Sequence, residues 1–254
     1  MSPIPGSAGL PAPGMDVRIV DDDGRECKVG QMGNLVLAYP LAPTALPTLW
    51  KNRAGLEKSY LAKFKGKGDW FDTGDSAVID EQGYVTILAR SDDIIQVAAH
   101  RLGTGLIEQV VTGHPKVIEC CVVGAPDKMK GQVPFALVVA AGSAAPKEGG
   151  FASSAKDPTA KAMLKDINDH VRKEMGPIAQ LGGLVIASKL PKTRSGKTLR
   201  RSVRAIVENV ADGKPDGEIP VPPTVEDASV IPLVKDAIFE YFRTQGEGKT
   251  QSKL

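Results

Sequence analysis

The sequence predicts an α/β (α+β) fold in which a β-rich first part is followed by a compact alternation of strands and helices. Two observations support this prediction. Short β-branched runs separated by turns rich in Asp and Gly fill the first part, up to about Leu88. From Ile94 onward, apolar runs of strand length alternate with segments whose apolar residues recur at helical spacing. We therefore place a domain boundary near Asp92.

The first part is expected to begin with a β-hairpin. Residues 15–20 and 33–39 are β-rich, and between them lies Asp21-Asp22-Asp23-Gly24, a turn sequence that tolerates positive φ. Residues 54–64 predict a short helix, and residues 84–88 predict a further strand. This part is assigned to residues 1–91.

The second part, residues 92–205, should form a small α/β domain. The pattern predicts four strands, over residues 94–97, 117–123, 133–140 and 182–188. It also predicts two helices, over residues 105–112 and 160–175. In helix 160–175 the apolar stripe comprises Leu164, Ile167, Val171 and Met175. Residues 142–158, rich in small residues, Gly and Pro, are expected to form a surface loop.

Residues 206–254 are expected to form a proline-rich arm, a terminal helix and a tail. Four prolines lie within residues 211–224, which indicates an extended segment. Residues 228–244 place Ile231, Val234 and Ile238 at helical spacing.

Composition excludes several classes of protein. Lys plus Arg number 32 against 30 Asp plus Glu, so the formal charge of +2 offers no basic field for nucleic acid. Three cysteines, two of them adjacent, indicate core thiols in a reducing compartment and no disulfide framework. The longest apolar stretches are interrupted by Pro or Gly, so we expect no membrane span. No metal site is expected from the protein's own side chains.

A basic segment, Leu190-Pro191-Lys192-Thr193-Arg194-Ser195-Gly196-Lys197, is the strongest candidate for chemistry. With Arg200 it groups four cationic residues around a Ser and a Gly, a composition that can wrap an anion. A solvated basic turn before a helix is the alternative. Two weaker candidates are Thr73-Gly74-Asp75, whose carboxylate could sit on a tight turn and accept hydrogen bonds from two hydroxyls, and Arg90 at a strand end.

Taken in their order along the chain, these motifs resemble the C-terminal part of adenylate-forming enzymes. Among those enzymes, they are most similar to short-chain acyl-CoA synthetases of the acetyl- and propionyl-CoA synthetase kind. The resemblance runs from about Gly6 to Ala205. It implies the end of a large β-rich adenylation domain followed by a small, mobile α/β C-terminal domain. The implied reaction uses ATP, with Mg²⁺, to join a short carboxylate such as acetate or propionate to coenzyme A, releasing AMP and pyrophosphate.

The resemblance also implies roles for individual residues. Lys197 matches the lysine that bridges the carboxylate and the α-phosphate during adenylation, where an ammonium offsets two anions. Asp75 and Arg90 match the pair that holds the ribose, and Arg101 matches an arginine that reaches nucleotide phosphate. Asp92 matches the hinge about which the C-terminal domain rotates between the two half-reactions.

Two further positions concern coenzyme A. Arg172 matches an arginine that contacts this substrate. Ala98-Ala99 stand where the family usually has Gly, often Ser-Gly, and that Gly lets the pantetheine thiol pass close to the backbone. Ala99 adds a methyl group there, so we expect a narrowed thiol tunnel or a shifted strand.

The family's phosphate loop and its adenine and acyl pockets would precede Gly6. We therefore expect the chain alone to bind ATP poorly. The alternative to a working synthetase is an inactive fragment that only binds coenzyme A or a partner. Finally, Ser252-Lys253-Leu254 has the form of a peroxisomal address read by an import receptor, with cytoplasm or mitochondrion as the alternative location.

Overall fold

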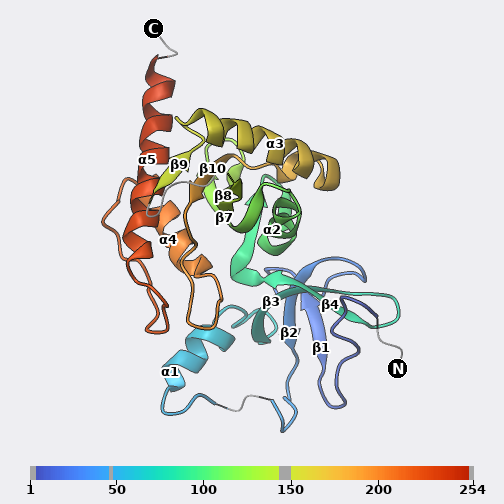
Figure 1. Ribbon diagram of the computed structural model, residues 1–254. Coiled ribbons are helices and arrows are strands. Elements are labelled where there is room, and N and C mark those ends of the chain that lie inside the picture. Colours follow the sequence, from blue (N-terminus) through green and yellow to red (C-terminus); the bar gives the residue numbers. More distant parts are fainter. Residues whose placement is uncertain (1–3, 46–47, 143–149, 252–254) are drawn as a thin grey trace. The chain divides into compact units, whose positions relative to one another are not determined.

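The computed structural model describes residues 4–45, 48–142 and 150–251, and the chain divides into two units (Figure 1). The first unit is residues 1–94 and the second is residues 95–254. Ser252-Lys253-Leu254 lies outside the described residues.

The first unit is built on a four-stranded antiparallel sheet in chain order. Its strands are β1 (Val17–Val20), β2 (Gly33–Leu37), β3 (Phe71–Ile79) and β4 (Val85–Arg90). The predicted hairpin is confirmed, since Val17 lies opposite Leu37 and Gly24 adopts φ 79° in the turn. The helix expected over residues 54–64 is shorter and irregular. It consists of α1 (Arg53–Leu56) and one π turn, η1 (Glu57–Leu61).

The segment Thr73-Gly74-Asp75 does not form a tight turn before a strand, so this expectation is wrong. It lies inside β3, at a β-bulge where the register against β2 shifts between Leu35 and Val36. Gly74 adopts φ 74°, which an L side chain rarely adopts. A bulge re-aims the side chains beside it, and here it accompanies the placing of Asp75 opposite Arg90 of β4.

The second unit contains a six-stranded mixed sheet with the order β6-β5-β8-β10-β9, in which β7 also pairs with β8. The strands are β5 (Ile94–Val97), β6 (His100–Gly103), β7 (Val117–Asp127), β8 (Gly131–Ala140), β9 (Phe151–Ser153) and β10 (Gly183–Ala187). All four predicted strands are present. Strands β6 and β9 were not predicted, and β9 lies inside the segment expected to be a loop.

Helices cover both faces of this sheet, as Figure 1 shows. They are α2 (Thr104–Thr112), α3 (Pro158–Met175), α4 (Arg200–Ala211) and α5 (Val230–Gln251). Successive strand residues point to opposite faces, so Val122 packs with α2 and α3 while Cys121 and Val123 pack with α4 and α5. The α/β prediction is confirmed. In α3 the buried stripe is Ala160, Met163, Ile167 and Val171, with Leu164 and Met175 partly buried.

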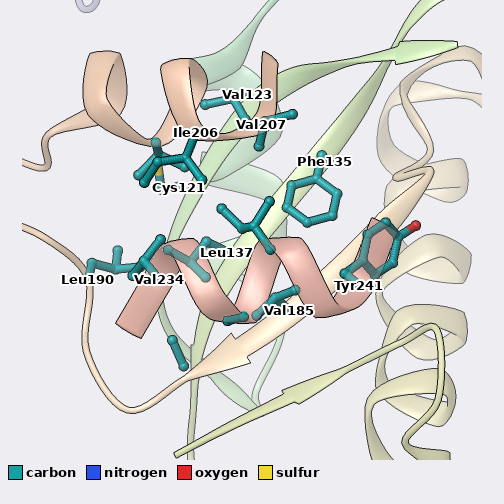
Figure 2. Packing of buried hydrophobic residues seen from close by; sticks show 14 of the residues in the cluster. Cys121, Val123, Phe135, Leu137, Val185, Leu190, Ile206, Val207, Val234 and Tyr241 are labelled. Carbon is teal, nitrogen blue, oxygen red and sulfur yellow. The ribbon is translucent and has the colours of Figure 1, made fainter. Parts of the chain in front are cut away.

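Helix α5 belongs to the core of the second unit. Its buried residues pack against strand residues such as Phe135 and Leu137 (Figure 2). The ring of Tyr241 lies over Gly183, where a Cβ would meet the Tyr241 hydroxyl at 2.0 Å, and that hydroxyl donates a hydrogen bond to the Gly182 carbonyl at 3.1 Å. Burial raises the pKa of Tyr241 to about 12. The terminal helix predicted over residues 228–244 is therefore present as α5, and its predicted stripe of Ile231, Val234 and Ile238 completes a hydrophobic layer.

Within the described part of the chain, no helix is both long enough and apolar enough to span a bilayer.

Candidate functional site

The basic motif forms a hydrogen-bonded loop between β10 and α4. Lys192 bridges to Thr198 in antiparallel fashion, and the Thr193 N–H donates to the Lys197 carbonyl at 2.8 Å. Gly196 closes the turn with φ 79°, and its N–H donates to the Thr193 carbonyl at 2.8 Å. The Lys197 N–H donates to Thr193 Oγ1 at 3.1 Å. The motif is therefore a defined hairpin, with Lys197 exposed next to the turn.

The end of the proline-rich segment lies against this loop. The Arg194 N–H donates to the Thr224 carbonyl at 2.9 Å, and the Glu226 N–H donates to the Lys192 carbonyl at 2.9 Å. Earlier in the arm, the Pro220 carbonyl accepts a hydrogen bond from Ser202 Oγ of α4 at 2.5 Å. The arm therefore adds a third stretch of backbone beside the two sides of the loop.

The cations of the motif differ in their partners. Lys192 is ion-paired with Glu119 and Arg200 with Glu108. No carboxylate lies within ion-pair distance of the Lys197 ammonium among the described residues. Lys197 thus retains a charge that an incoming anion could meet.

In the first unit, Asp75 and Arg90 are brought together across β3 and β4. Arg90 Nη1 donates to Asp75 Oδ1 at 3.0 Å, and the guanidinium reaches Thr73 carbonyl oxygen at 3.4 Å. The bulge is held by Thr73 Oγ1, which donates to the Leu35 carbonyl at 2.7 Å. A Cβ on Gly74 would approach Arg90 Nη2 to 2.8 Å, so Gly at this position also makes room for the guanidinium.

Asp92 follows this pair in a single turn of 3₁₀ helix, Ser91–Asp93. Arg90 Nε lies 3.9 Å from Asp92 Oδ1. A cavity of about 320 Å³ is lined by Lys63, Asp72, Gly74, Arg90, Ser91 and Asp92. Asp92 is exposed and lies close to Ile94, the last residue of the first unit.

Ala98 and Ala99 form the two-residue connection between β5 and β6. Ala98 adopts φ 52°, whereas Ala99 is not among the positive-φ residues. A positive φ at the first of two connecting residues is a conformation that normally takes Gly. The backbone that calls for Gly is therefore at Ala98, one residue before the position singled out from the sequence. Arg101 lies on β6, two residues beyond this connection.

Arg172 lies exposed in the last turn of α3, which Gly176 ends with φ 86°. In the second unit, Lys197, Ala99 and Arg172 come from three different connections or helix ends. Among the described residues, no hydrogen bond or ion pair joins any two of these three. The structure therefore brings together Asp75, Arg90 and Asp92. Lys197, Ala99 and Arg172 make no bond to one another.

Two side chains that the sequence analysis missed are Glu108 and Glu119, the partners of Arg200 and Lys192. They precede the motif by many residues, and no local pattern marks them. Across residues 4–45, 48–142 and 150–251, no group of three or more His, Cys, Asp or Glu is arranged to hold a metal ion.

The second unit, with this loop, is similar to the C-terminal domain of AMP-binding enzymes. Residues 106–197 match the family described as AMP-binding enzyme C-terminal domain. Among solved structures, the anthranilate CoA ligase AuaEII in complex with anthranoyl-AMP aligns with a TM-score of 0.61 and 28% identity, covering 83% of this chain and 36% of that chain. Acetoacetyl-CoA synthetase from Streptomyces lividans shares the fold with a TM-score of 0.69 at 21% identity, covering 92% and 32%.

Curated relatives narrow the class. Acyl-CoA synthetase short-chain family member 3, mitochondrial, of Rattus norvegicus is 38% identical over 237 residues, which are 93% of this chain and 32% of that protein. Acetyl-coenzyme A synthetase of Pyrobaculum arsenaticum is 38% identical over 236 residues, with the same two shares. The chain carries an AMP-binding enzyme C-terminal domain and is homologous to short-chain acyl-CoA synthetases over most of its length. It spans about a third of the length of these relatives.

Proposed function

We propose that this chain works as the C-terminal part of an AMP-forming acyl-CoA synthetase that activates acetate or propionate. The observation that carries the proposal is the exposed Lys197 ammonium, which has no ion-pair partner among the described residues and stands on a hydrogen-bonded loop. The likeness to short-chain synthetases supports this reaction class.

In the first half-reaction a carboxylate oxygen attacks the α-phosphorus of ATP, and the bond from that phosphorus to the pyrophosphate oxygen breaks. Two anions meet in this step, so an ammonium between them stabilises the transition state. Lys197 supplies that charge. Asp75 accepts hydrogen bonds from the ribose hydroxyls, with Arg90 beside it at 3.0 Å, and Arg101 reaches a phosphate.

In the second half-reaction the thiol of coenzyme A replaces AMP on the acyl carbon and loses its proton. We propose that the small domain turns about Asp92 between the two steps, because an exposed polar residue in a single 3₁₀ turn can change φ and ψ without disturbing a core. Arg172 then contacts coenzyme A, and the Ala98-Ala99 connection borders the path of the thiol.

The test separates the two half-reactions in the full-length synthetase. Pyrophosphate exchange measures adenylation, and acyl-CoA formation from synthetic acyl-adenylate measures thioester formation. Lys197→Ala should lower adenylation on the order of a hundredfold and spare thioester formation, as for other single transition-state donors. Arg172→Ala should show the reverse pattern, with a raised requirement for coenzyme A that reflects roughly 1.5–3 kcal/mol of lost binding.

Matched controls are Lys161→Ala and Lys173→Ala, which remove exposed cations from α3, Lys173 directly beside Arg172. Both controls should leave adenylation unchanged. Equal loss of both half-reactions in a folded Lys197→Ala protein would contradict the assignment.

The second candidate function is a fragment without turnover that binds coenzyme A or a partner. The observation behind it is Arg172, which is exposed in the last turn of α3 and open to an anionic ligand. Calorimetric titration of the isolated chain with coenzyme A and with ATP tests it. Binding of coenzyme A without carboxylate-dependent AMP formation would support this reading for the isolated chain, whereas turnover by the isolated chain would exclude it.

We further propose peroxisomal import through Ser252-Lys253-Leu254. A fluorescent protein that carries residues 246–254 at its carboxyl terminus should enter peroxisomes. The same fusion without the last three residues is the control. Diffuse or mitochondrial signal from the complete tail would contradict the proposal, and mitochondrial signal would fit the location named for the Rattus norvegicus relative.

A further inference from the structure

The basic motif, residues 190–197, is called the Lys197 loop from here on. At each end of this loop a cation is bound to a glutamate on another element. Lys192 opens the loop and Arg200 follows it as the first residue of α4. Their partners are Glu119 of β7 and Glu108 of α2. In the sequence these cations look equivalent to Lys197, but their ammonium and guanidinium groups are turned toward carboxylates of the same unit.

The contact at the first end is short and partly shielded. Lys192 Nζ donates to Glu119 Oε1 at 2.6 Å, and the two side chains are 27% and 39% exposed. Both residues line the groove between α2, the start of β7 and the loop. An ion pair at this depth is stronger than a fully solvated one, because water screens it less.

The contact at the other end has two bonds. Arg200 Nη2 donates to Glu108 Oε2 at 2.7 Å, and Arg200 Nε donates to Glu108 Oε1 at 3.2 Å. Glu108 Oε1 also accepts the backbone N–H of Val122 at 2.8 Å, which anchors the carboxylate to β7. A forked Arg–carboxylate contact fixes direction as well as distance. It also offsets the unfavourable position of a cation in the first turn of a helix.

We propose that Glu108 and Glu119 are positioning residues that hold the Lys197 loop in the geometry for adenylation. This inference rests on the proposed function, in which Lys197 is the adenylation lysine. Neither glutamate touches substrate in the proposal. Each acts through a cation at one end of the loop, so that Lys197 is presented from a hairpin whose two ends are both fixed. A flexible loop would present the ammonium in the productive position for a smaller fraction of the time.

Hydrogen exchange of the isolated chain tests the positioning directly, without any activity. The N–H groups of Thr193, Gly196 and Lys197 are bonded within the loop and report its opening. Glu119→Gln should speed their exchange roughly fivefold to tenfold, and Glu108→Gln should do so by more. Asp166→Asn is the matched control, because it removes one ion pair of similar length, Lys116 Nζ to Asp166 Oδ2 at 2.8 Å, away from the loop.

The second readout is the split between half-reactions in the full-length synthetase. Glu119→Gln should lower kcat of pyrophosphate exchange about threefold to tenfold with little change in KM for ATP, and should leave thioester formation from acyl-adenylate unchanged. Reversing the pair, with Glu119→Lys and Lys192→Glu together, should restore most of the loss. A general loss of folding would lower both half-reactions and would not be rescued.

The outcomes separate cleanly. Faster loop exchange together with slower adenylation, both rescued by charge reversal, supports the proposal. Unchanged loop exchange in Glu119→Gln and Glu108→Gln overturns it, and so does faster exchange with full adenylation. If Lys197→Ala itself retains adenylation, the proposed function fails, while the exchange rates still decide whether the two glutamates hold the loop.

Discussion

Replacing Ala98 with Gly should stabilise the second unit, although the change removes a methyl group. Ala98 adopts φ 52°, a left-handed conformation that costs an L residue roughly 1–2 kcal/mol. Its side chain is exposed, so little packing is lost. Gly also raises the conformational entropy of the unfolded chain, which favours unfolding by about 0.4–1 kcal/mol and opposes the relief of backbone strain. The net effect is a stabilisation of about 0.5–1 kcal/mol. The bond from the Ala98 N–H to the Lys130 carbonyl, 2.7 Å, is kept by either residue.

Ala99→Gly is the matched control, because Ala99 is equally exposed but does not have a positive φ. It should lower the free energy of unfolding by about 0.4–1 kcal/mol, the opposite sign. Both tryptophans, Trp50 and Trp70, lie in the first unit, so their fluorescence does not report this change. The change can be measured by urea unfolding followed by circular dichroism, together with native-state hydrogen exchange at the amides of β8. Destabilisation by Ala98→Gly, or equal effects of both variants, would refute the reasoning.

Two further predictions concern side chains of the second unit. Ile238→Ala should lower the free energy of unfolding of this unit by about 2–5 kcal/mol, because Ile238 is fully buried in α5. Phe239→Ala is the control and should cost much less, because Phe239 is 40% exposed. Urea unfolding followed by circular dichroism measures both. Cys120 and Cys27 are both partly exposed, but desolvation raises the pKa of the Cys120 thiol to about 11. At pH 7 iodoacetamide should therefore label Cys120 more slowly than Cys27 in the folded protein and at a similar rate in urea, and similar rates in the folded protein would contradict the raised pKa.

The elements with strong local patterns could be predicted from the sequence. Helix α3 has a clear apolar stripe and Pro158 at its start, and β7 and β8 are long apolar runs. Strand β9 could not be predicted, because its three residues follow a stretch of small residues and gain their strand character only from pairing with β10. The bulge in β3 was mistaken for a turn, because Gly with positive φ serves both structures.

The candidate site, too, could be predicted only where its residues are close together in the sequence. The basic motif and the Thr73-Gly74-Asp75 segment were found because their residue types are local in sequence. The pairing of Asp75 with Arg90 depends on the register of β3 against β4, which places them opposite one another. Glu108 lies 92 residues before Arg200, so only the folded structure reveals that contact. The need for Gly at Ala98, and not at Ala99, is a property of φ that composition does not contain.

The cations of the basic motif illustrate how the fold assigns different tasks to similar side chains. Lys192 and Arg200 each lie within 2.7 Å of a carboxylate oxygen, so their charges are neutralised locally and their positions are fixed. Lys197 lies between them in sequence, on a backbone held by Thr193 and flanked by the arm at Thr224. If all these cations were free, an anion could bind at several places along the loop. Because the two outer cations are held by glutamates, the charges of the motif that are left for a substrate, among the described residues, are those of Arg194 and Lys197 in the exposed turn between them.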